Sequence, residues 1–250
     1  LKLPFALWTR AAIVQLIQRK FGLALPVRTM GHYLKRWGFT AQKPIKRAYE
    51  QRPEAITAWL KTEYPRIKRR AVAEGAAIHW GDETSLSTSD PRGRSFAPKG
   101  KTPVRPMLSQ RRAVSFLSTV SNTGTLRFMV LKKPLDAPTL IKFFTRLCRD
   151  ADRKVFVILD NLNVHKARAV RAWVAAHAEA IALFYLPAYS PELNPDEYLN
   201  GDLKLSVAKR APARDRDALL RTATTRLRSL QRRPDQVKKF FHHPRVRYAA

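Results

Sequence analysis

The pattern of apolar and polar residues predicts two short helices near the start of the chain. Apolar residues recur at helical spacing between Thr9, which suits a helix start, and Gly22, which suits a helix end. A second helical pattern covers residues 27–37 and places its apolar members on one inward face, namely Met30, Tyr33, Leu34 and Trp37. The outward positions of this helix are basic, namely Arg28, His32, Lys35 and Arg36. This arrangement is typical of a helix-turn-helix that binds DNA, and a helical hairpin with a solvated basic face is the alternative.

After these helices comes a basic, proline-containing segment, residues 41–53, which includes Lys43, Lys46 and Arg47. Its composition predicts a linker or a wing rather than a further helix. A helical pattern then covers residues 54–73 and is interrupted near Pro65.

Short apolar runs in the rest of the chain predict five strands, at residues 76–80, 113–120, 125–131, 155–159 and 181–185. Residues 121–124 form a turn between the second and third strands. Residues 155–159 are all apolar, which indicates a strand buried on both faces. Helical patterns at 137–150 and 165–178 separate the last strands. Hairpin strands followed by alternating helix and strand predict the α/β class with a mixed sheet flanked by helices.

Charge points to a polyanionic partner. The 250 residues carry a formal net charge of +29, and nucleic acid is the leading candidate because each neutralised phosphate releases counterions. An anionic membrane surface is the alternative, but we find no strongly amphipathic terminal helix and no apolar run long enough to span a bilayer. The single cysteine excludes a disulfide framework and a cysteine-based zinc finger. Residues 1–74 and 204–250 are the most basic parts, and the middle of the chain holds most of the carboxylates.

Two aspartates follow predicted strands directly. Asp82 comes after the first strand and Asp160 after the fourth, and functional sites of α/β sheets lie beyond the carboxyl ends of the strands. Two close carboxylates repel, and a divalent ion such as Mg²⁺ or Mn²⁺ relieves that repulsion. Either aspartate alone would also suit a helix cap or a turn. Glu197 follows Asn194 by three residues, with Pro195 between them, so a capping box with a purely structural role is the alternative there.

Three blocks of sequence carry a family resemblance. Residues 80–84 (WGDET), 158–165 (ILDNLNVH) and 186–204 (LPAYSPELNPDEYLNGDLK), together with the tail 243–248 (HPRVRY), resemble bacterial insertion-sequence transposases of the mariner-related superfamily. The resemblance implies an RNase H-like fold and a catalytic DDE triad of Asp82, Asp160 and Glu197 that holds two Mg²⁺ or Mn²⁺ ions. Three other acids lie close in sequence and rank below the triad, namely Glu83, Glu192 and Asp196.

The resemblance also implies a reaction and its partners. The expected activity is metal-dependent cleavage and strand transfer of double-stranded DNA at the terminal inverted repeats and the target, by a homodimer, in the bacterial cytoplasm with the nucleoid. Three further residues are candidates for supporting the triad or contacting phosphate, namely Asn161, His165 and Lys204. For His165, a surface position at the start of a helix is the alternative. A basic loop could line the DNA path, or be a solvated loop, and contains Lys99, Lys101 and Arg105.

The expected organisation has three parts. Residues 1–50 would form a small winged-helix-like helix-turn-helix domain, residues 51–75 a helical linker, and residues 76–250 the catalytic domain with a basic helical tail. Because the family usually has two helix-turn-helix units, residues 1–50 match the second, and the first is expected to be missing from this chain. Two other functions stay open: a catalytically inactive transposase remnant that only binds DNA, and a different RNase H-like nuclease that acts on hybrids or junctions.

Overall fold

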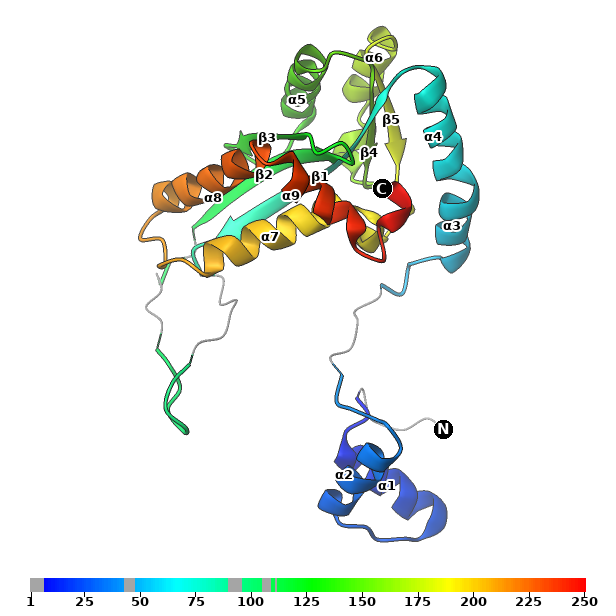
Figure 1. Cartoon of the computed structure of the whole chain (residues 1–250), viewed down its shortest axis with the longest axis vertical. Coiled ribbons are helices and arrows are strands. Elements are labelled where there is room, and N and C mark those ends of the chain that lie inside the picture. Colours follow the sequence, from blue (N-terminus) through cyan, green and yellow to red (C-terminus); the bar gives the residue numbers. More distant parts are fainter. Residues whose placement is uncertain (1–6, 43–47, 90–95, 105–108, 111) are drawn as a thin grey trace. The chain divides into compact units, whose positions relative to one another are not determined.

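Two compact units make up the chain. The computed structural model describes residues 7–42, 48–89, 96–104, 109–110 and 112–250. Residues Leu1–Arg47 form one unit and residues Ala48–Ala250 form the other (Figure 1). Four residues with predicted DNA-contacting roles lie outside the described residues, namely Lys43, Lys46, Arg47 and Arg105. Among the helices of the described ranges, none has both the length and the apolar character that a membrane span needs.

The first unit contains the predicted helix pair, α1 (Arg10–Phe21) and α2 (Val27–Arg36). Thr9 caps α1 by accepting a hydrogen bond from the N–H of Ala12 at 3.1 Å, and Gly22 ends the helix at φ 70°. Met30 is fully buried between the helices.

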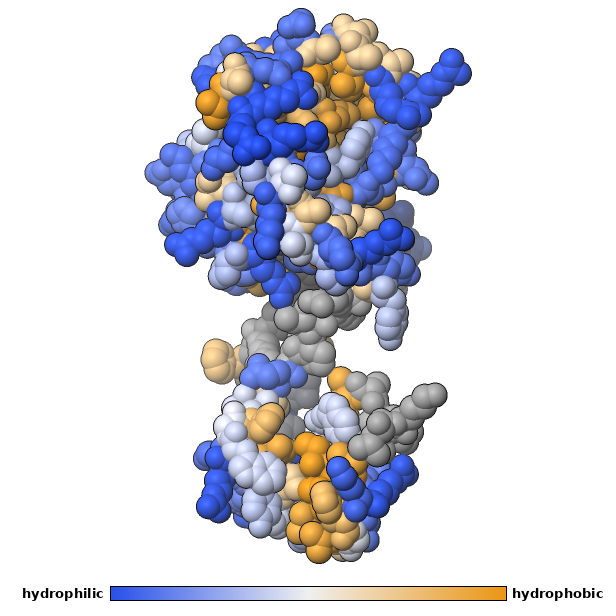
Figure 2. Space-filling view, turned by 90° about the vertical axis from the view of Figure 1, so that its right-hand side faces the viewer, coloured by the Kyte–Doolittle hydropathy of each residue, from blue (hydrophilic) through white to orange (hydrophobic). Residues whose placement is uncertain are grey.

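The predicted inward orientation of Tyr33 and Trp37 is wrong. Their exposed fractions are 39% and 57%, and their rings stack on one another with centroids 5.4 Å apart. Two short helices bury only the seam between them, so side chains beside the seam stay in contact with water. Other large apolar residues of this unit are exposed as well, and Figure 2 shows apolar side chains gathered on its surface.

The second unit begins with a helical segment made of α3 (Pro53–Ala58), a π-helical turn η1 (Trp59–Glu63) and α4 (Tyr64–Ala73). The π turn is the interruption predicted near Pro65: the N–H of Tyr64 bonds to the carbonyl of Trp59, five residues back. Trp59, Tyr64 and Ile67 are buried in the hydrophobic core of the second unit. The segment predicted as a helical linker therefore packs as part of the second unit.

A five-stranded sheet forms the centre of this unit, as predicted. Its strands are β1 (Ala77–Ser87), β2 (Ala113–Ser121), β3 (Leu126–Leu131), β4 (Val155–Leu159) and β5 (Ile181–Tyr185), in the order β3-β2-β1-β4-β5. The β1–β2 and β2–β3 pairs are antiparallel, and the β1–β4 and β4–β5 pairs are parallel. Gly124 gives the β2–β3 turn its positive φ of 95°. The sheet is therefore mixed.

Helices cover both faces of the sheet (Figure 1). On one face lie α5 (Ala137–Asp150) and α6 (Arg168–Ala176), which pack against Val155, Val157 and Leu159. On the other face, Phe156 and Ile158 join a core with α3–α4, α7 (Asp196–Ala208), α8 (Arg216–Gln231) and α9 (Pro234–Lys239). Strand β4 is buried on both faces, which explains why its five residues are all apolar.

The carboxyl-terminal tail anchors the segment that leads into α7. The hydroxyl of Tyr248 accepts a hydrogen bond from Trp59 Nε1 at 3.0 Å and donates one to the carbonyl of Leu193 at 2.9 Å. Its ring packs edge-on against Tyr64 and Trp80. Short 3₁₀ turns at Pro191–Leu193, Phe240–His242 and Arg247–Ala249 complete this region. The tail thereby fixes the start of the helix that carries Glu197.

Candidate active site

The register of β1 and β4 aligns the two predicted aspartates. Trp80 pairs with Ile158 at the end of the parallel ladder, and Asp82 and Asp160 each lie two residues further on. The prediction that β1 ends before Asp82 is wrong, because β2 continues to pair with β1 and places Asp82 opposite Ser118. Asp82 thus lies within a strand, whereas Asp160 follows the end of β4 as predicted.

Asp82, Asp160 and Glu197 all line one pocket of about 580 Å³. The rest of its wall comes from residues 161–163 after β4 and from residues 186–191 and 194, ahead of α7. Within the described ranges, no three His, Cys, Asp or Glu side chains approach closely enough to enclose one ion. The three acids therefore line one pocket, but in the described part of the chain they do not converge on a single ion position.

Asp82 is held by two hydrogen bonds on its two carboxylate oxygens. Oδ1 accepts from the N–H of Glu83 at 2.8 Å, and Oδ2 accepts from Asn200 Nδ2 at 3.0 Å. Burial, followed by the charges of Glu197 and Asp160, raises the pKa of Asp82 to about 7, against the smaller opposing effects of the Glu83 N–H and the Lys204 charge. The carboxylate is oriented, but its negative charge is not balanced.

Asp160 lies in a different electrostatic environment. Its Oδ1 accepts from the N–H of Leu162 at 3.1 Å and lies 2.9 Å from His165 Nδ1. Burial acts to raise the pKa of Asp160, but the hydrogen bonds of His165 and Leu162 and the nearby positive charges together lower it. The alternative of a surface position for His165 is wrong, since the side chain is only 1% exposed.

Asn161 links the segment that follows β4 to the segment that follows β5. Its Nδ2 donates to the carbonyl of Leu186, at the end of β5, and its Oδ1 accepts from Lys166 Nζ. The amide of Leu186 in turn donates to the carbonyl of Leu159 at 2.8 Å. Asn161 therefore braces the loop after Asp160 against the loop that leads to Glu197.

The start of α7 does not form the capping box. Asn194 Oδ1 accepts from the N–H of Asp196 at 3.0 Å, and Asn194 Nδ2 donates to the carbonyl of Gly81 at 3.0 Å. The main-chain N–H of Asn194 donates to the carbonyl of Pro191 instead of to Glu197. Asn194 thus caps α7 and ties it to β1, while Glu197 lines the pocket.

The neighbouring acids occupy other places. Asp196 is completely buried and accepts a hydrogen bond from Ser118 Oγ at 2.8 Å; burial raises its pKa well above the usual value. Glu192 Oε1 accepts from Gln51 Nε2 at 2.7 Å. Glu83 is outside the described lining of the pocket. Asn200 is not among the residues predicted from the sequence, although its spacing of one helical turn after Glu197 places it on the same side of α7.

The remaining predicted residues lie at the surface or near it. Lys204 is half-buried on α7, and its charge acts on Asp82. Four basic residues of α2 are exposed, namely Arg28, His32, Lys35 and Arg36. Lys99 and Lys101 are exposed too. Their roles stay predictions.

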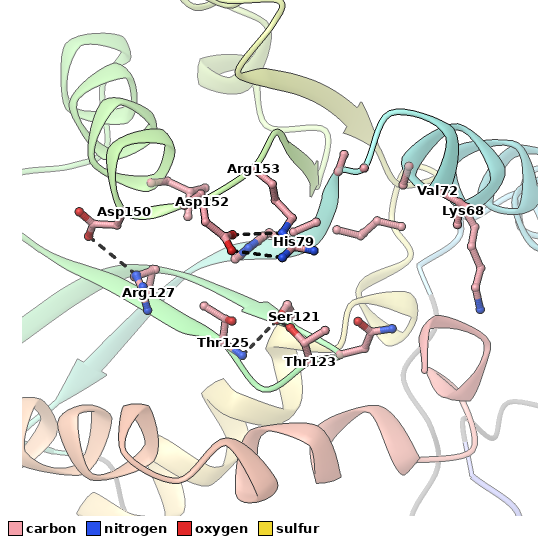
Figure 3. A pocket seen from close by; sticks show the side chains of 18 of the residues that line it. Lys68, Val72, His79, Ser121, Thr123, Thr125, Arg127, Asp150, Asp152 and Arg153 are labelled. Carbon is pink, nitrogen blue, oxygen red and sulfur yellow. Dashed lines mark hydrogen bonds and ion pairs between the residues drawn. The ribbon is translucent and has the colours of Figure 1, made fainter.

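A second hollow, of about 620 Å³, lies at the amino ends of β1 and β4 (Figure 3). Its arginines are already paired: Arg127 with Asp150 at 3.8 Å and Arg153 with Asp152 at 3.1 Å. Burial, aided by the charge of Arg127, lowers the pKa of His79 in its wall to about 4. With its acids paired to arginines, this hollow lacks the uncompensated negative charge of the carboxylate pocket.

Comparison with known families matches the sequence of the pocket-bearing segment to one family. The sequence profile of the DDE superfamily endonucleases matches residues 77–220, which contain all three pocket carboxylates. The chain belongs to the DDE superfamily endonucleases. A winged helix-turn-helix profile matches residues 4–63. No curated protein matches the sequence.

Several solved structures share the fold of this DDE endonuclease. The Mos1 mariner paired end complex with Mg has a TM-score of 0.63 and 17% identity, covering 99% of this chain and 81% of that one. The Mos1 mariner paired end complex with Mn has a TM-score of 0.62 and 15% identity, covering 100% and 82%. The Mos1 strand transfer complex has a TM-score of 0.58 and 17% identity, covering 95% and 80%. The predicted DDE family and the predicted α/β fold with a mixed sheet are confirmed.

Proposed function

We propose that this DDE endonuclease is a DNA transposase, which cleaves double-stranded DNA at the ends of a mobile element and transfers the cut strand to a target. One observation carries the proposal: carboxylates from three separate segments line one pocket, and the charges of Glu197 and Asp160 help to raise the pKa of Asp82. Such uncompensated negative charge favours a cation.

The donor set fits a hard divalent ion. Carboxylate oxygens are the ligands that Mg²⁺ and Mn²⁺ prefer, and Asp82, Asp160 and Glu197 would hold two of these ions. When bound, the ions would activate the attacking water or DNA hydroxyl and stabilise the leaving oxygen. The related Mos1 complexes are described with Mg and with Mn, which supports the same choice here.

The surrounding residues of this chain orient the proposed ligands. Asn200 and the N–H of Glu83 fix both oxygens of Asp82, and the contacts of His165 and Leu162 fix Asp160. We infer supporting roles for Asn161 and His165 on this basis. Lys204, whose charge reaches Asp82, could contact a phosphate beside the ligands.

Binding to DNA is proposed from charge and from the helix-turn-helix. A net charge of +29 favours a polyanion, and the exposed basic face of α2, with Arg28, His32, Lys35 and Arg36, suits phosphate or base contacts. Lys99 and Lys101 would add phosphate contacts. Pairing of two element ends by a homodimer, and action on bacterial DNA in the cytoplasm, are parts of the same proposal.

The test compares cleavage by the wild type and by two carboxylate variants. A supercoiled plasmid is incubated with the full chain and Mn²⁺ or Mg²⁺, and nicked and linear products are measured. Asp160→Asn and Glu197→Gln should reduce cleavage to background, whereas Asp235→Asn, which changes an exposed acid on α9, should not. Undiminished cleavage by Asp160→Asn would refute the triad. Salt-sensitive DNA binding without any cleavage by the wild type would instead indicate a DNA-binding remnant.

A further inference from the structure

One wall of the carboxylate pocket is apolar and carries an exposed aromatic ring. Leu162 and residues 186–191, which include Pro187, Tyr189 and Pro191, line the pocket beside the three acids. Tyr189 is 58% exposed. Phosphate-binding chemistry alone needs no such wall, because phosphate oxygens bind cations and N–H donors. An apolar wall with a flat ring suits the flat face of a nucleobase.

The backbone at this tyrosine adopts an unfavourable conformation. Tyr189 has φ 56°, the only positive φ at a residue other than glycine in the described part of the chain. In this left-handed region the Cβ atom crowds the backbone, so glycine or asparagine is the usual occupant. Strained backbone tends to lie at ligand-binding sites, where the surrounding structure maintains it.

Contacts from a distant residue and from within the loop itself maintain this loop. Gln51 Nε2 donates to the carbonyl of Tyr189 at 2.8 Å and to Glu192 Oε1 at 2.7 Å. Ser190, which is buried, donates to the carbonyl of Ala188 at 3.2 Å. The main chain is therefore fixed on both sides of Tyr189, while the ring itself is left exposed. A fixed loop with an exposed ring is suited to a stacking contact.

We propose that Tyr189 stacks on an unpaired nucleobase next to the phosphate held at Asp82, Asp160 and Glu197. The inference rests on the proposed function for the identity of the ligand as DNA. It adds that the substrate reaches the carboxylates with a base out of the duplex, because a paired and stacked base has no free face to offer the ring. An aromatic ring accepts any base, so the contact recognises an unpaired state rather than a sequence.

The test is a stacking measurement that requires no cleavage. A short duplex with a single-stranded end containing 2-aminopurine is titrated with the full chain in Ca²⁺, and quenching of its fluorescence reports stacking. Wild type and Tyr189→Phe should quench, whereas Tyr189→Leu and Tyr189→Asn should not, and their affinity for the single-stranded end should fall roughly 5- to 150-fold. Tyr49→Leu, which alters a fully exposed tyrosine outside the pocket, is the matched control and should behave as wild type.

The asparagine variant separates stacking from folding. Asparagine tolerates the left-handed conformation better than tyrosine, so Tyr189→Asn should unfold at the same temperature as wild type or a higher one while losing the quenching. Equal quenching by wild type, Tyr189→Leu and Tyr189→Asn would overturn the proposal.

Plasmid cleavage in Mn²⁺ distinguishes this proposal from the proposed function. If the wild type cleaves DNA but the Tyr189 variants quench as the wild type does, the stacking proposal is refuted and the proposed function stands. If quenching depends on Tyr189 but the wild type does not cleave DNA, the proposed transposase activity is refuted and the stacking contact stands.

Discussion

Asp82→Asn should stabilise the metal-free protein at neutral pH although it removes a proposed catalytic group. Burial and the neighbouring acids raise the pKa of Asp82 from 3.8 to about 7. In the folded state this carboxyl therefore keeps a proton that the unfolded chain has already released between about pH 4 and pH 7. Rising pH favours unfolding throughout this window, and the full loss of stability is reached above pH 7.

The size of the effect follows from the shift. A change of about three pKa units corresponds to about 4 kcal/mol at 1.4 kcal/mol per unit, as an upper value. Of this, the two pH units between about pH 5 and pH 7 account for about 3 kcal/mol. For a unit of this size, 1 kcal/mol shifts the unfolding temperature by about 2–4 °C, so about 6–12 °C separates the two conditions. Asparagine does not ionise, so Asp82→Asn should not show this loss of stability with rising pH.

The local hydrogen bonds allow the substitution. Both oxygens of Asp82 accept hydrogen bonds, from the N–H of Glu83 and from Asn200 Nδ2, and an asparagine amide would place an N–H donor against one of them. The buried Oδ1 of Asn200 has no hydrogen-bond partner. Rotation of the Asn200 amide by half a turn would present this oxygen to the new donor. The variant therefore keeps a hydrogen bond between residues 82 and 200, while Asn200 Nδ2 turns away from residue 82.

The assay is thermal unfolding of the full chain in EDTA at about pH 5 and about pH 8. Wild type should lose more stability than Asp82→Asn on going to the higher pH, and Asp235→Asn should behave as wild type. Added Mg²⁺ should raise the unfolding temperature of the wild type at pH 8 and have little effect on Asp82→Asn. Parallel pH profiles for wild type and Asp82→Asn would show that the pKa of Asp82 is not raised in the folded protein, and would refute the reasoning.

Three further substitutions test the framework around the pocket by urea unfolding. Gly81→Ala should cost about 1–3 kcal/mol, because its Cβ would lie 2.8 Å from Leu159 Cδ2 and 3.2 Å from the carbonyl of Ser118; unchanged stability would contradict the close approach. Asn194→Ala should cost about 1–3 kcal/mol, since it removes the bonds to Gly81 and Asp196, whereas the control Asn163→Ala, at an exposed position, should cost little. Tyr248→Phe should cost about 1–3 kcal/mol through loss of the bonds to Trp59 and Leu193, and a neutral result would show that the tail does not anchor this region.

Sequence patterns predicted the elements well where burial alone decides the residue type. The run 155–159 is apolar because β4 is covered by helices on both faces. Such a strand can be predicted from its own residues, without knowledge of its neighbours. The residue at which β1 ends could not be predicted in this way. Residues 82–85 are polar, yet they continue the strand because β2 supplies a full partner through Ser87. Tyr33 and Trp37 show the converse, since helical spacing indicates a common face but not what covers it.

The choice between Asp196 and Glu197 could not be made from spacing, since adjacent residues of a helix point about 100° apart and either could face the pocket. The rotation of α7 decides it, and Asn194 holds that rotation. One end of its amide binds the carbonyl of Gly81, the residue before Asp82, and the other caps α7 through Asp196. With the helix fixed in this way, Asp196 is buried against Ser118 on β2, and Glu197 lines the pocket with Asp82 and Asp160. A residue that suits helix capping by its type therefore also links the first proposed ligand to the third, a link that exists only once β1 and α7 are side by side.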